Sequence, residues 1–332
     1  MQLRQLGSSE LKVTPVILGT WAIGGWWWGG SDDDKAIEAI NAALDAGINC
    51  IDTAPMYGFG HSEKTVGEAI QGRRDQVVIA TKCGLRWDLA EGEHFFDDST
   101  PERGAFTVYR NLKRDSILWE CEQSLRRLGV DHIDLYQCHW SDETTPLSET
   151  MDALTGLLDE GVVGAIGVSN FTPEMIAECL QYGPVHTSQP KFSLLTRASL
   201  ADIIPYCHEH GVASIVYSSM EQGILTGKVT PDRRYEDGDK RPEKNPWFQP
   251  DNLKSALAVL EETVQPIADA HDATLAQVAL AWTIAEPGIT CALAGARTAE
   301  QARENAAAMQ VRLSDEEHAE LLAAFETLGE PE

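Results

Sequence analysis

The chain has 332 residues, 43% of them hydrophobic, and a net charge of −26 from 52 acidic and 26 basic side chains. A chain of this length can bury a large core in one domain. No block of Lys and Arg interrupts the acidic excess, which argues against nucleic acid or an anionic membrane as a partner, because both need a positive surface. The excess also suggests a host cytoplasm of high ionic strength, where salt screens the repulsion between like charges.

The seven cysteines fall mostly in apolar runs and show no paired spacing. This pattern predicts free thiols in a reducing compartment, and it argues against a disulfide framework or a zinc site. Residues 1–7 carry no apolar signal core, and no run reaches the roughly 18 apolar residues of a membrane span. We therefore expect a cytoplasmic protein without a metal site.

Segments typical of strands and helices alternate along the chain. Residues 2–6 and 11–16, joined by Gly7-Ser8-Ser9, predict a β-hairpin that precedes this alternation. The expected strands span residues 16–20, 50–54, 77–82, 132–139, 163–168, 187–192, 214–219 and 290–294. The expected helices span residues 34–46, 62–70, 114–127, 146–160, 173–182, 198–210, 253–271, 275–285, 299–307 and, at the C-terminal end, 314–328.

Within this pattern, Ser62 is expected to cap the helix at 62–70. The segments 83–112 and 228–252 show no regular pattern, and the first is long enough to indicate a functional loop. Eight strands in βα alternation predict a closed (β/α)8 TIM barrel of the α/β class, with an N-terminal β-hairpin and additional helices, as a single domain over residues 1–332. An open doubly wound sheet is the alternative, but no GxGxxG motif follows the first strand.

Ionisable side chains lie where the expected strands end. The ends of the second, third and fourth strands carry Asp52, Lys82 and His139, each following an apolar run, and Tyr57 lies just past the second strand, across Pro55. Each alone has an ordinary structural explanation, as a loop anchor, a solvent-reaching lysine or a core histidine. The strand ends of a barrel share one mouth, so we expect these four to converge there.

The chemistry of this group is proton transfer to oxygen. An isolated Tyr has a pKa near ~10, and a nearby ammonium lowers it by stabilising the phenolate. Asp52 would keep Lys82 charged and oriented, while His139 could donate a hydrogen bond to a carbonyl oxygen beside Tyr57. No Ser or Cys lies beside a base, so the nucleophile is expected from outside the protein, and a hydride from a nicotinamide fits.

At this point the chain resembles the aldo-keto reductases, over residues 3–305. The four strand-end residues match the catalytic tetrad of that family. Residues 124–129, leading into residues 134–136, are similar to its second signature. The pattern is nearest to the bacterial branch that resembles general-stress reductases and potassium-channel β-subunits. The resemblance implies that Tyr57 protonates a carbonyl oxygen while hydride passes from the nicotinamide to the carbonyl carbon, or that the reverse reaction occurs.

The resemblance also implies where the nicotinamide and pyrophosphate bind. Ser169, Asn170 and Gln189 match the ligands of the carboxamide, and Tyr217 matches the ring that stacks under the nicotinamide. Residues 218–228 resemble the loop over the pyrophosphate. The expected cofactor residues on this side are Gly19, Thr20, Trp21, Ser169, Asn170, Gln189, Tyr217, Ser218, Ser219, Gly223 and Lys228.

At the adenosine end the chain departs from the family pattern. Ala294 stands where the family often has Pro, and Gln301 stands where many members have Arg. Arg297, just before the last barrel helix, is the best remaining ligand for a 2'-phosphate, although it could also be a solvated surface charge. Glu304 and Asn305 match the adenine contacts, so the expected cofactor residues at this end are Arg297, Gln301, Glu304 and Asn305. We therefore expect NADP(H) in preference to NAD(H).

Aromatic and sulfur-containing side chains follow the first four strands. The residues expected to contact substrate are Trp21, Met56, Trp87 and Trp140. If they line the mouth, they favour a substrate with an apolar face or a sugar, whereas packing among the loops would say little about specificity. The resemblance implies a small aldehyde, ketone or sugar as substrate and leaves the choice and the oligomeric state open.

Two other functions fit parts of the pattern. A Schiff-base aldolase would use Lys82 as its nucleophile, which would leave Asp52, Ser169, Asn170 and Gln189 without a clear purpose. A non-catalytic subunit that senses the nicotinamide cofactor is suggested by the channel-associated relatives, but here the whole tetrad is present. We rank both below a reductase.

Overall fold

The computed structural model describes residues 2–331 and shows a closed barrel of eight parallel strands surrounded by helices. The expected (β/α)8 fold is confirmed. The barrel strands, in their order around the barrel, are β3 (Val16–Gly19), β4 (Cys50–Asp52), β5 (Val78–Cys83), β9 (Ile133–Cys138), β10 (Val163–Ser169), β11 (Thr187–Gln189), β12 (Ala213–Val216) and β13 (Ile289–Gly295).

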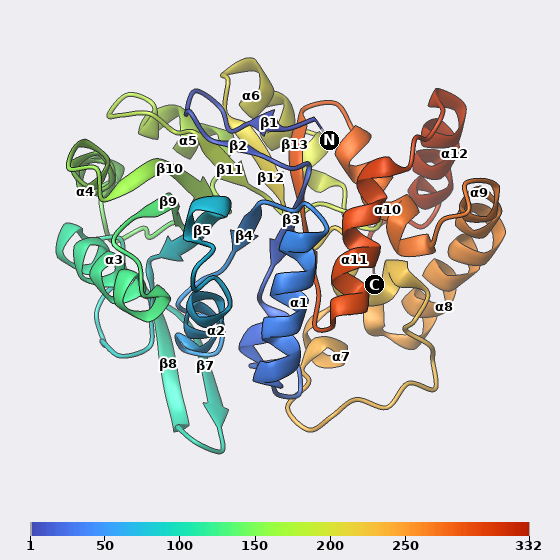
Figure 1. The fold of residues 1–332 in the computed structure, drawn as a ribbon, viewed down its shortest axis with the longest axis horizontal. Helices are drawn as coiled ribbons and strands as arrows, with labels where there is room; N and C mark the ends of the chain where they lie inside the picture. The colour runs from blue at the N-terminus through green and yellow to red at the C-terminus, as the bar shows by residue number, and fades with distance from the viewer. Residues whose placement is uncertain (1, 332) are drawn as a thin grey trace.

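Helices cover the outside of the barrel (Figure 1). The α-helices are α1 (Asp33–Asp45), α2 (His61–Ala69), α3 (Arg114–Leu128), α4 (Leu147–Asp159), α5 (Pro173–Cys179), α6 (Ile203–Glu209), α7 (Arg241–Lys244), α8 (Pro250–Val259), α9 (Gln265–Ala270), α10 (Leu275–Ala285), α11 (Ala299–Ala307) and α12 (Asp315–Glu326). Segments of 3-10 helix lie at Ala22–Gly24, Arg74–Gln76, Ala198–Leu200, Glu221–Thr226, Pro246–Phe248 and Ala308–Gln310.

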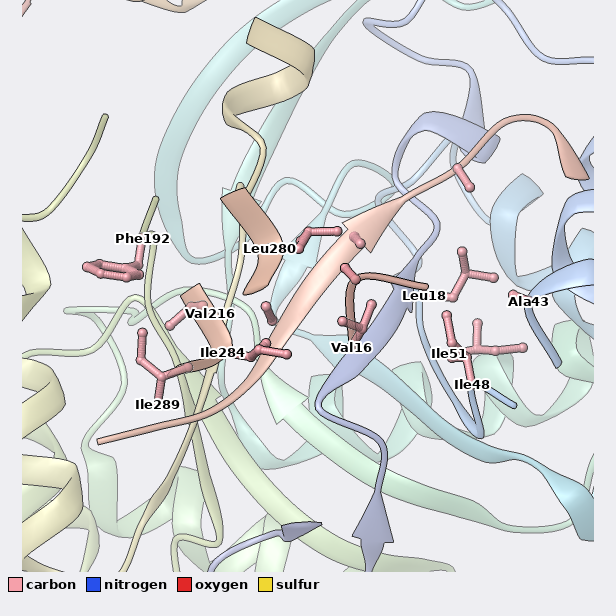
Figure 2. Packing of buried hydrophobic residues seen from close by; sticks show 14 of the residues in the cluster. Val16, Leu18, Ala43, Ile48, Ile51, Phe192, Val216, Leu280, Ile284 and Ile289 are labelled. Carbon is pink, nitrogen blue, oxygen red and sulfur yellow. The ribbon is translucent and has the colours of Figure 1, made fainter. Parts of the chain in front are cut away.

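The alternation of side chains along each strand separates two apolar layers. Val16 and Leu18 of β3 point outward and pack with residues of α1, and Figure 2 shows Leu18, Ala43, Ile48 and Ile51 gathered there. Ile17, between the two outward residues, belongs to a separate cluster inside the barrel. The same alternation turns every second residue of the other strands inward, which is what aims their terminal polar residues at one mouth.

The expected N-terminal hairpin is confirmed. Its strands, β1 (Arg4–Gln5) and β2 (Lys12–Val13), are shorter than the sequence indicated. Leu6 and Val13 are fully buried in the inner cluster, so the hairpin closes the end of the barrel at which the strands begin. Figure 1 shows it at the opposite end from α7 and from the hairpin of β7 (Glu93–Thr100) and β8 (Gly104–Arg110).

The expectation that residues 83–112 form an irregular loop is wrong. They contain a three-stranded antiparallel sheet, in the order β6-β8-β7, made of β6 (Leu85–Arg86), β8 (Gly104–Arg110) and β7 (Glu93–Thr100). The sheet is stabilised on one face by an aromatic cluster that includes Phe95, Phe96 and Phe106. It forms a long hairpin that projects from the barrel mouth (Figure 1).

Two expected helices are interrupted. The helix at 253–271 begins earlier, at Pro250, and is broken into α8 and α9 by a π-helical turn, Leu260–Val264. Pro266 follows this turn and has no N–H to donate, which accounts for the irregularity. The helix at 198–210 is a 3-10 turn followed by α6. Residues 228–252 are likewise not a plain loop, because α7 and the start of α8 lie within them.

Ser62 does not cap its helix, contrary to expectation. The N-cap of α2 is Gly60, whose φ of 91° suits a residue without a side chain. Ser62 is fully buried instead, and its hydroxyl donates to the hydroxyl of Thr20 at 2.7 Å and bonds that of Thr53 at 2.9 Å. It therefore fastens α2 to the ends of β3 and β4.

Among residues 2–331, no helix is long and apolar enough to cross a membrane.

Candidate active site

Lys82 lies at the centre of the hydrogen-bonded group at the barrel mouth. Its Nζ donates to Asp52 Oδ1 at 2.6 Å, to the Thr53 carbonyl at 3.0 Å and to Tyr57 Oη at 3.2 Å. Lys82 is fully buried and Asp52 is 2% exposed. Since three acceptors occupy its three donor positions, the ammonium is fixed with one N–H aimed at the phenol. Three of the four residues expected to converge are thus in direct contact.

The local backbone explains how Asp52 and Tyr57 reach the same point. Asp52 is the last residue of β4, and the chain then turns, with the Tyr57 amide donating to the Ala54 carbonyl at 3.1 Å. Gly24 packs directly against this turn, and a Cβ there would lie 2.5 Å from the Tyr57 carbonyl carbon. A residue other than glycine at this position would push Tyr57 out of place.

His139 lies beside the phenol. Its ring meets that of Tyr57 edge to face, with 5.8 Å between centroids, and its backbone amide donates to the Cys83 carbonyl at 2.9 Å. Burial, aided by the nearby charge of Lys82, lowers the pKa of His139 well below its ordinary value. The imidazole is therefore neutral at pH 7 and can donate one hydrogen bond to a substrate oxygen next to Tyr57.

Burial and neighbouring charges have opposite effects on the pKa values of Lys82 and Tyr57. Burial would lower the pKa of Lys82, but Asp52 and Tyr57 outweigh it and raise that pKa above its ordinary value. Burial raises the pKa of Tyr57, and Lys82 offsets this only in part. The expected lowering of the phenol pKa by the ammonium is thus present but smaller than the opposing effect of burial, so Tyr57 carries its proton at neutral pH.

Next to this group lies a second network, made of the residues expected to hold the nicotinamide. Tyr217 Oη donates to Asn170 Oδ1 at 2.8 Å, and Asn170 Nδ2 donates to the His139 carbonyl at 3.0 Å and to Ser169 Oγ at 3.0 Å. Ser169 Oγ donates to the Gln189 carbonyl at 2.8 Å. The side-chain amide of Gln189 donates to Asp52 Oδ2 at 2.9 Å. These residues therefore form one connected network with the tetrad.

A pocket of about 490 Å³ runs from Asp52 and Tyr57 toward α11. It is lined by twelve of the fifteen residues expected to bind cofactor: Gly19, Thr20, Trp21, Tyr217, Ser218, Ser219, Gly223, Lys228, Arg297, Gln301, Glu304 and Asn305. The other three are Ser169, Asn170 and Gln189, which belong to the hydrogen-bonded network beside it.

The pocket is positively charged within a strongly acidic protein. Its charged lining is Lys35, Lys228, Arg233, Arg241 and Arg297 against Asp32, Asp52 and Glu304. Ser218, Gln222 and Gly223 have positive φ values of 61°, 54° and 106°, a backbone form that can turn N–H groups toward an anion. The N-terminus of α11, capped by Thr298, lies at the far end. This lining suits an elongated ligand with a pyrophosphate at its middle.

At the adenosine end, Arg297 is already engaged with the protein. Its guanidinium donates to the carbonyl oxygens of Trp28 at 3.1 Å and Gly30 at 2.8 Å, and its backbone amide donates to Gln301 Oε1 at 2.8 Å. Glu304 accepts from Lys228 at 2.9 Å. Asn305 Nδ2 donates to the Gly295 carbonyl at 3.0 Å.

The expected substrate residues fall into two places. Trp21 lines the pocket, with its ring centroid 6.3 Å from that of Tyr57. Met56 is 3% exposed and packs, together with Trp87 and Trp140, in the aromatic cluster under the β7–β8 hairpin. Trp140 directly follows His139, and its ring contacts Phe95 at 5.2 Å between centroids. A role in substrate contact stays a prediction for all four.

Several pocket residues were not expected from the sequence. Trp28 comes from the connection between β3 and α1, Asp32 is the N-cap of α1, and Lys35 lies in its first turn. Arg233 and Arg241 come from the segment after β12. Three successive tryptophans at 26–28 indicate that the connection between β3 and α1 is packed against other residues, but the sequence does not show which ones.

Comparison with known proteins identifies the family. A model of the aldo/keto reductase family matches residues 15–326. The chain belongs to the aldo/keto reductase family. It is 41% identical over 316 residues to the NADH-specific methylglyoxal reductase of Escherichia coli (strain K12), covering 93% of this chain and 94% of that one. It is 36% identical over 299 residues to the aldo-keto reductase YhdN of Bacillus subtilis (strain 168), covering 90% and 85%.

Solved structures of the family share the fold. The glycerol dehydrogenase AKR11B4 from Gluconobacter oxydans is similar, with a TM-score of 0.87 and 36% identity over 99% of this chain and 96% of that one. The holo form of the aldo-keto reductase AKR11C1 from Bacillus halodurans has a TM-score of 0.77 and 28% identity, covering 100% and 97%. As a member of this family, the protein is a nicotinamide-dependent oxidoreductase that reduces carbonyl groups.

Proposed function

We propose that this aldo-keto reductase reduces small aldehydes, ketones or sugars to alcohols, with Tyr57 as proton donor and NADP(H) as cofactor, or catalyses the reverse reaction. The observation that carries the proposal is the hydrogen bond of 3.2 Å from Lys82 to Tyr57 Oη, at the inner end of a pocket that suits a dinucleotide. When bound there, the nicotinamide supplies the hydride to the carbonyl carbon.

The protein residues then have separate roles. Tyr57 gives its proton to the substrate oxygen as negative charge develops on that atom. Lys82 faces the phenol with a fixed positive charge, which stabilises the phenolate left behind. Asp52 holds that charge in place by the contact at 2.6 Å. His139, being neutral, donates a hydrogen bond to the same substrate oxygen and orients the carbonyl.

For the adenosine end, we propose that Arg297 binds the 2'-phosphate of NADP(H) with the donors it does not use for Trp28 and Gly30. The E. coli relative named above is NADH-specific, so the chain's own residues have to decide the preference. Arg297→Ala should raise the KM for NADPH about tenfold more than the KM for NADH, since it removes a charge-assisted hydrogen bond. The ratio of the two cancels any disturbance of residues 28–30 that both cofactors share. An equal rise in the KM values for NADPH and NADH would contradict the proposed role of Arg297 in binding the 2'-phosphate.

The alternative of an aldolase is weaker, because a Schiff base forms from a neutral amine. Asp52 and Tyr57 raise the pKa of Lys82, so its amine stays protonated. A sensing subunit without activity would not need a neutral imidazole beside a buried phenol. The seven buried free cysteines are consistent with the proposed cytoplasmic location.

The test is oxidation of cofactor at 340 nm with a panel of aldehydes, ketones and sugars, each with NADPH and with NADH. The proposal expects turnover of at least one carbonyl substrate, with NADPH the better cofactor. Binding of both cofactors without turnover of any substrate would favour the sensing subunit.

A further inference from the structure

Asp98 lies on the β7–β8 hairpin and contacts two other loops. The three segments follow three different barrel strands. Its side chain is 7% exposed, although its neighbour Asp97 is 72% exposed. Asp98 Oδ2 accepts a hydrogen bond from Trp27 Nε1 at 2.8 Å, and Oδ1 forms an ion pair with Lys240. Trp27 follows β3, the hairpin follows β5, and Lys240 follows β12. Hydrogen bonds from Lys240 and Trp27 outweigh the effect of burial and lower the pKa of Asp98, so it is ionised at neutral pH.

Two of these loops are also joined to each other. We call residues 26–30 the tryptophan loop and residues 236–244 the strap. The Lys240 amide donates to the Trp27 carbonyl at 3.1 Å, and Trp28 pairs with Asp239 in an antiparallel bridge. The guanidinium of Arg241 lies over the Trp28 ring at 4.4 Å. The contact between loop and strap is therefore continuous over both the backbone and the side chains.

The joined segments form part of the wall of the cofactor pocket. Trp28 lines the pocket from the tryptophan loop and Arg241 lines it from the strap. Arg297, the proposed phosphate ligand, holds the tryptophan loop through the carbonyls of Trp28 and Gly30. A dinucleotide that extended from Tyr57 to Arg297 would lie against both of these wall segments, so parting the loop from the strap would open the pocket around it.

We propose that Asp98 locks the tryptophan loop to the strap and thereby controls the rate at which the nicotinamide cofactor leaves. This inference rests on the proposed placement of the cofactor in the pocket. In the closed arrangement, Asp98 balances the largely buried charge of Lys240, which is 26% exposed. Without the carboxylate, the charge of Lys240 has no partner while the loop and the strap are in contact, but it is solvated when they separate. The population of the open arrangement therefore increases. Asp98 is a positioning residue, since it contacts the loops and not the reacting atoms.

Two variants and one matched control test the lock. Asp98→Asn removes the ion pair and keeps an acceptor for Trp27, whereas Trp27→Phe keeps the ring and removes its N–H. Asp97→Asn changes an exposed carboxylate on the same strand, whose partners, Thr107 and His94, lie within the hairpin. The experiment measures the rate of NADPH release by stopped-flow fluorescence, and separately the rate of hydride transfer in a single turnover.

We expect release to become about tenfold faster in Asp98→Asn and severalfold faster in Trp27→Phe, as the loss of one charge-assisted bond would produce. Hydride transfer should stay within about twofold of wild type, and Asp97→Asn should release cofactor at the wild-type rate. Unchanged release in both variants would overturn the lock, as would an equal increase in Asp97→Asn, which would indicate a loosened hairpin. If wild-type protein did not bind NADPH or NADH at all, the proposed function itself would fail first.

Discussion

The ammonium of Lys82 lies 2.6 Å from the carboxylate of Asp52, and both groups are almost completely buried. Each charge is costly to bury alone, so each is the reason that the other is tolerated. Asp52 receives a second hydrogen bond from Gln189 at 2.9 Å, which ties the pair to the network of Ser169, Asn170 and Tyr217. A buried pair of this kind fixes the direction of the third N–H of Lys82, toward Tyr57.

Removing one partner of this pair should destabilise the fold more than removing both. Lys82→Met leaves an uncompensated buried carboxylate, and we expect it to lower the free energy of unfolding by about 3–5 kcal/mol. Lys82→Met combined with Asp52→Asn removes both charges and should recover part of that loss. Urea unfolding at pH 7 measures both variants. A double variant less stable than the single one would show that the pair itself is strongly stabilising.

His139 gives the protein a dependence on acid whose sign follows from its pKa. Burial lowers that pKa in the folded state below its ordinary value of 6.5. The unfolded chain therefore binds this proton more readily, and the stability that the neutral imidazole contributes is complete above pH 6.5 and is lost as pH falls below it. Thermal unfolding between pH 7.5 and 5 should show a smaller decrease of Tm in His139→Gln than in wild type. An equal decrease would mean that His139 is not kept neutral by the fold.

Salt should stabilise this protein. The net charge of −26 makes the folded state repel itself, and salt screens that repulsion, with a Debye length of about 10 Å at 0.1 M and 3 Å at 1 M. We expect Tm to rise by several degrees between 0.1 and 2 M KCl, and an uncharged osmolyte at matched osmolality serves as control. A Tm that stays constant or falls in KCl would contradict the hypothesis of a host cytoplasm of high ionic strength.

The arrangement of the tetrad could be predicted from the sequence because one geometric rule of the barrel fold applies to it. The ends of parallel barrel strands face one mouth, so Asp52 and Lys82 could be placed together without knowing any distance, and the structure puts them in contact. The same rule placed His139 next to Tyr57, where their rings meet edge to face. What could not be derived was the balance of burial against charge at Tyr57, because burial depends on the packing of the whole mouth.

Features set by tertiary contacts were missed. The hairpin of β7 and β8 has alternating residues and a glycine at its turn, but its aromatic side chains are buried against rings from other loops, among them Phe59, Trp26 and Trp140. No local pattern marks Asp98, because its partners Trp27 and Lys240 lie 71 and 142 residues away in the sequence. Pro266 was the one local sign that the helix at 253–271 is interrupted.

Tyr57, held by Lys82, is the proposed proton donor of this protein. The most direct test compares wild type with Tyr57→Phe, which removes only the hydroxyl, in cofactor oxidation at 340 nm and in cofactor binding by fluorescence. We expect kcat to fall about 10²- to 10⁴-fold, the usual contribution of a general acid, while the Kd for NADPH stays within about twofold. Full activity in Tyr57→Phe, with cofactor bound normally, would contradict the assignment.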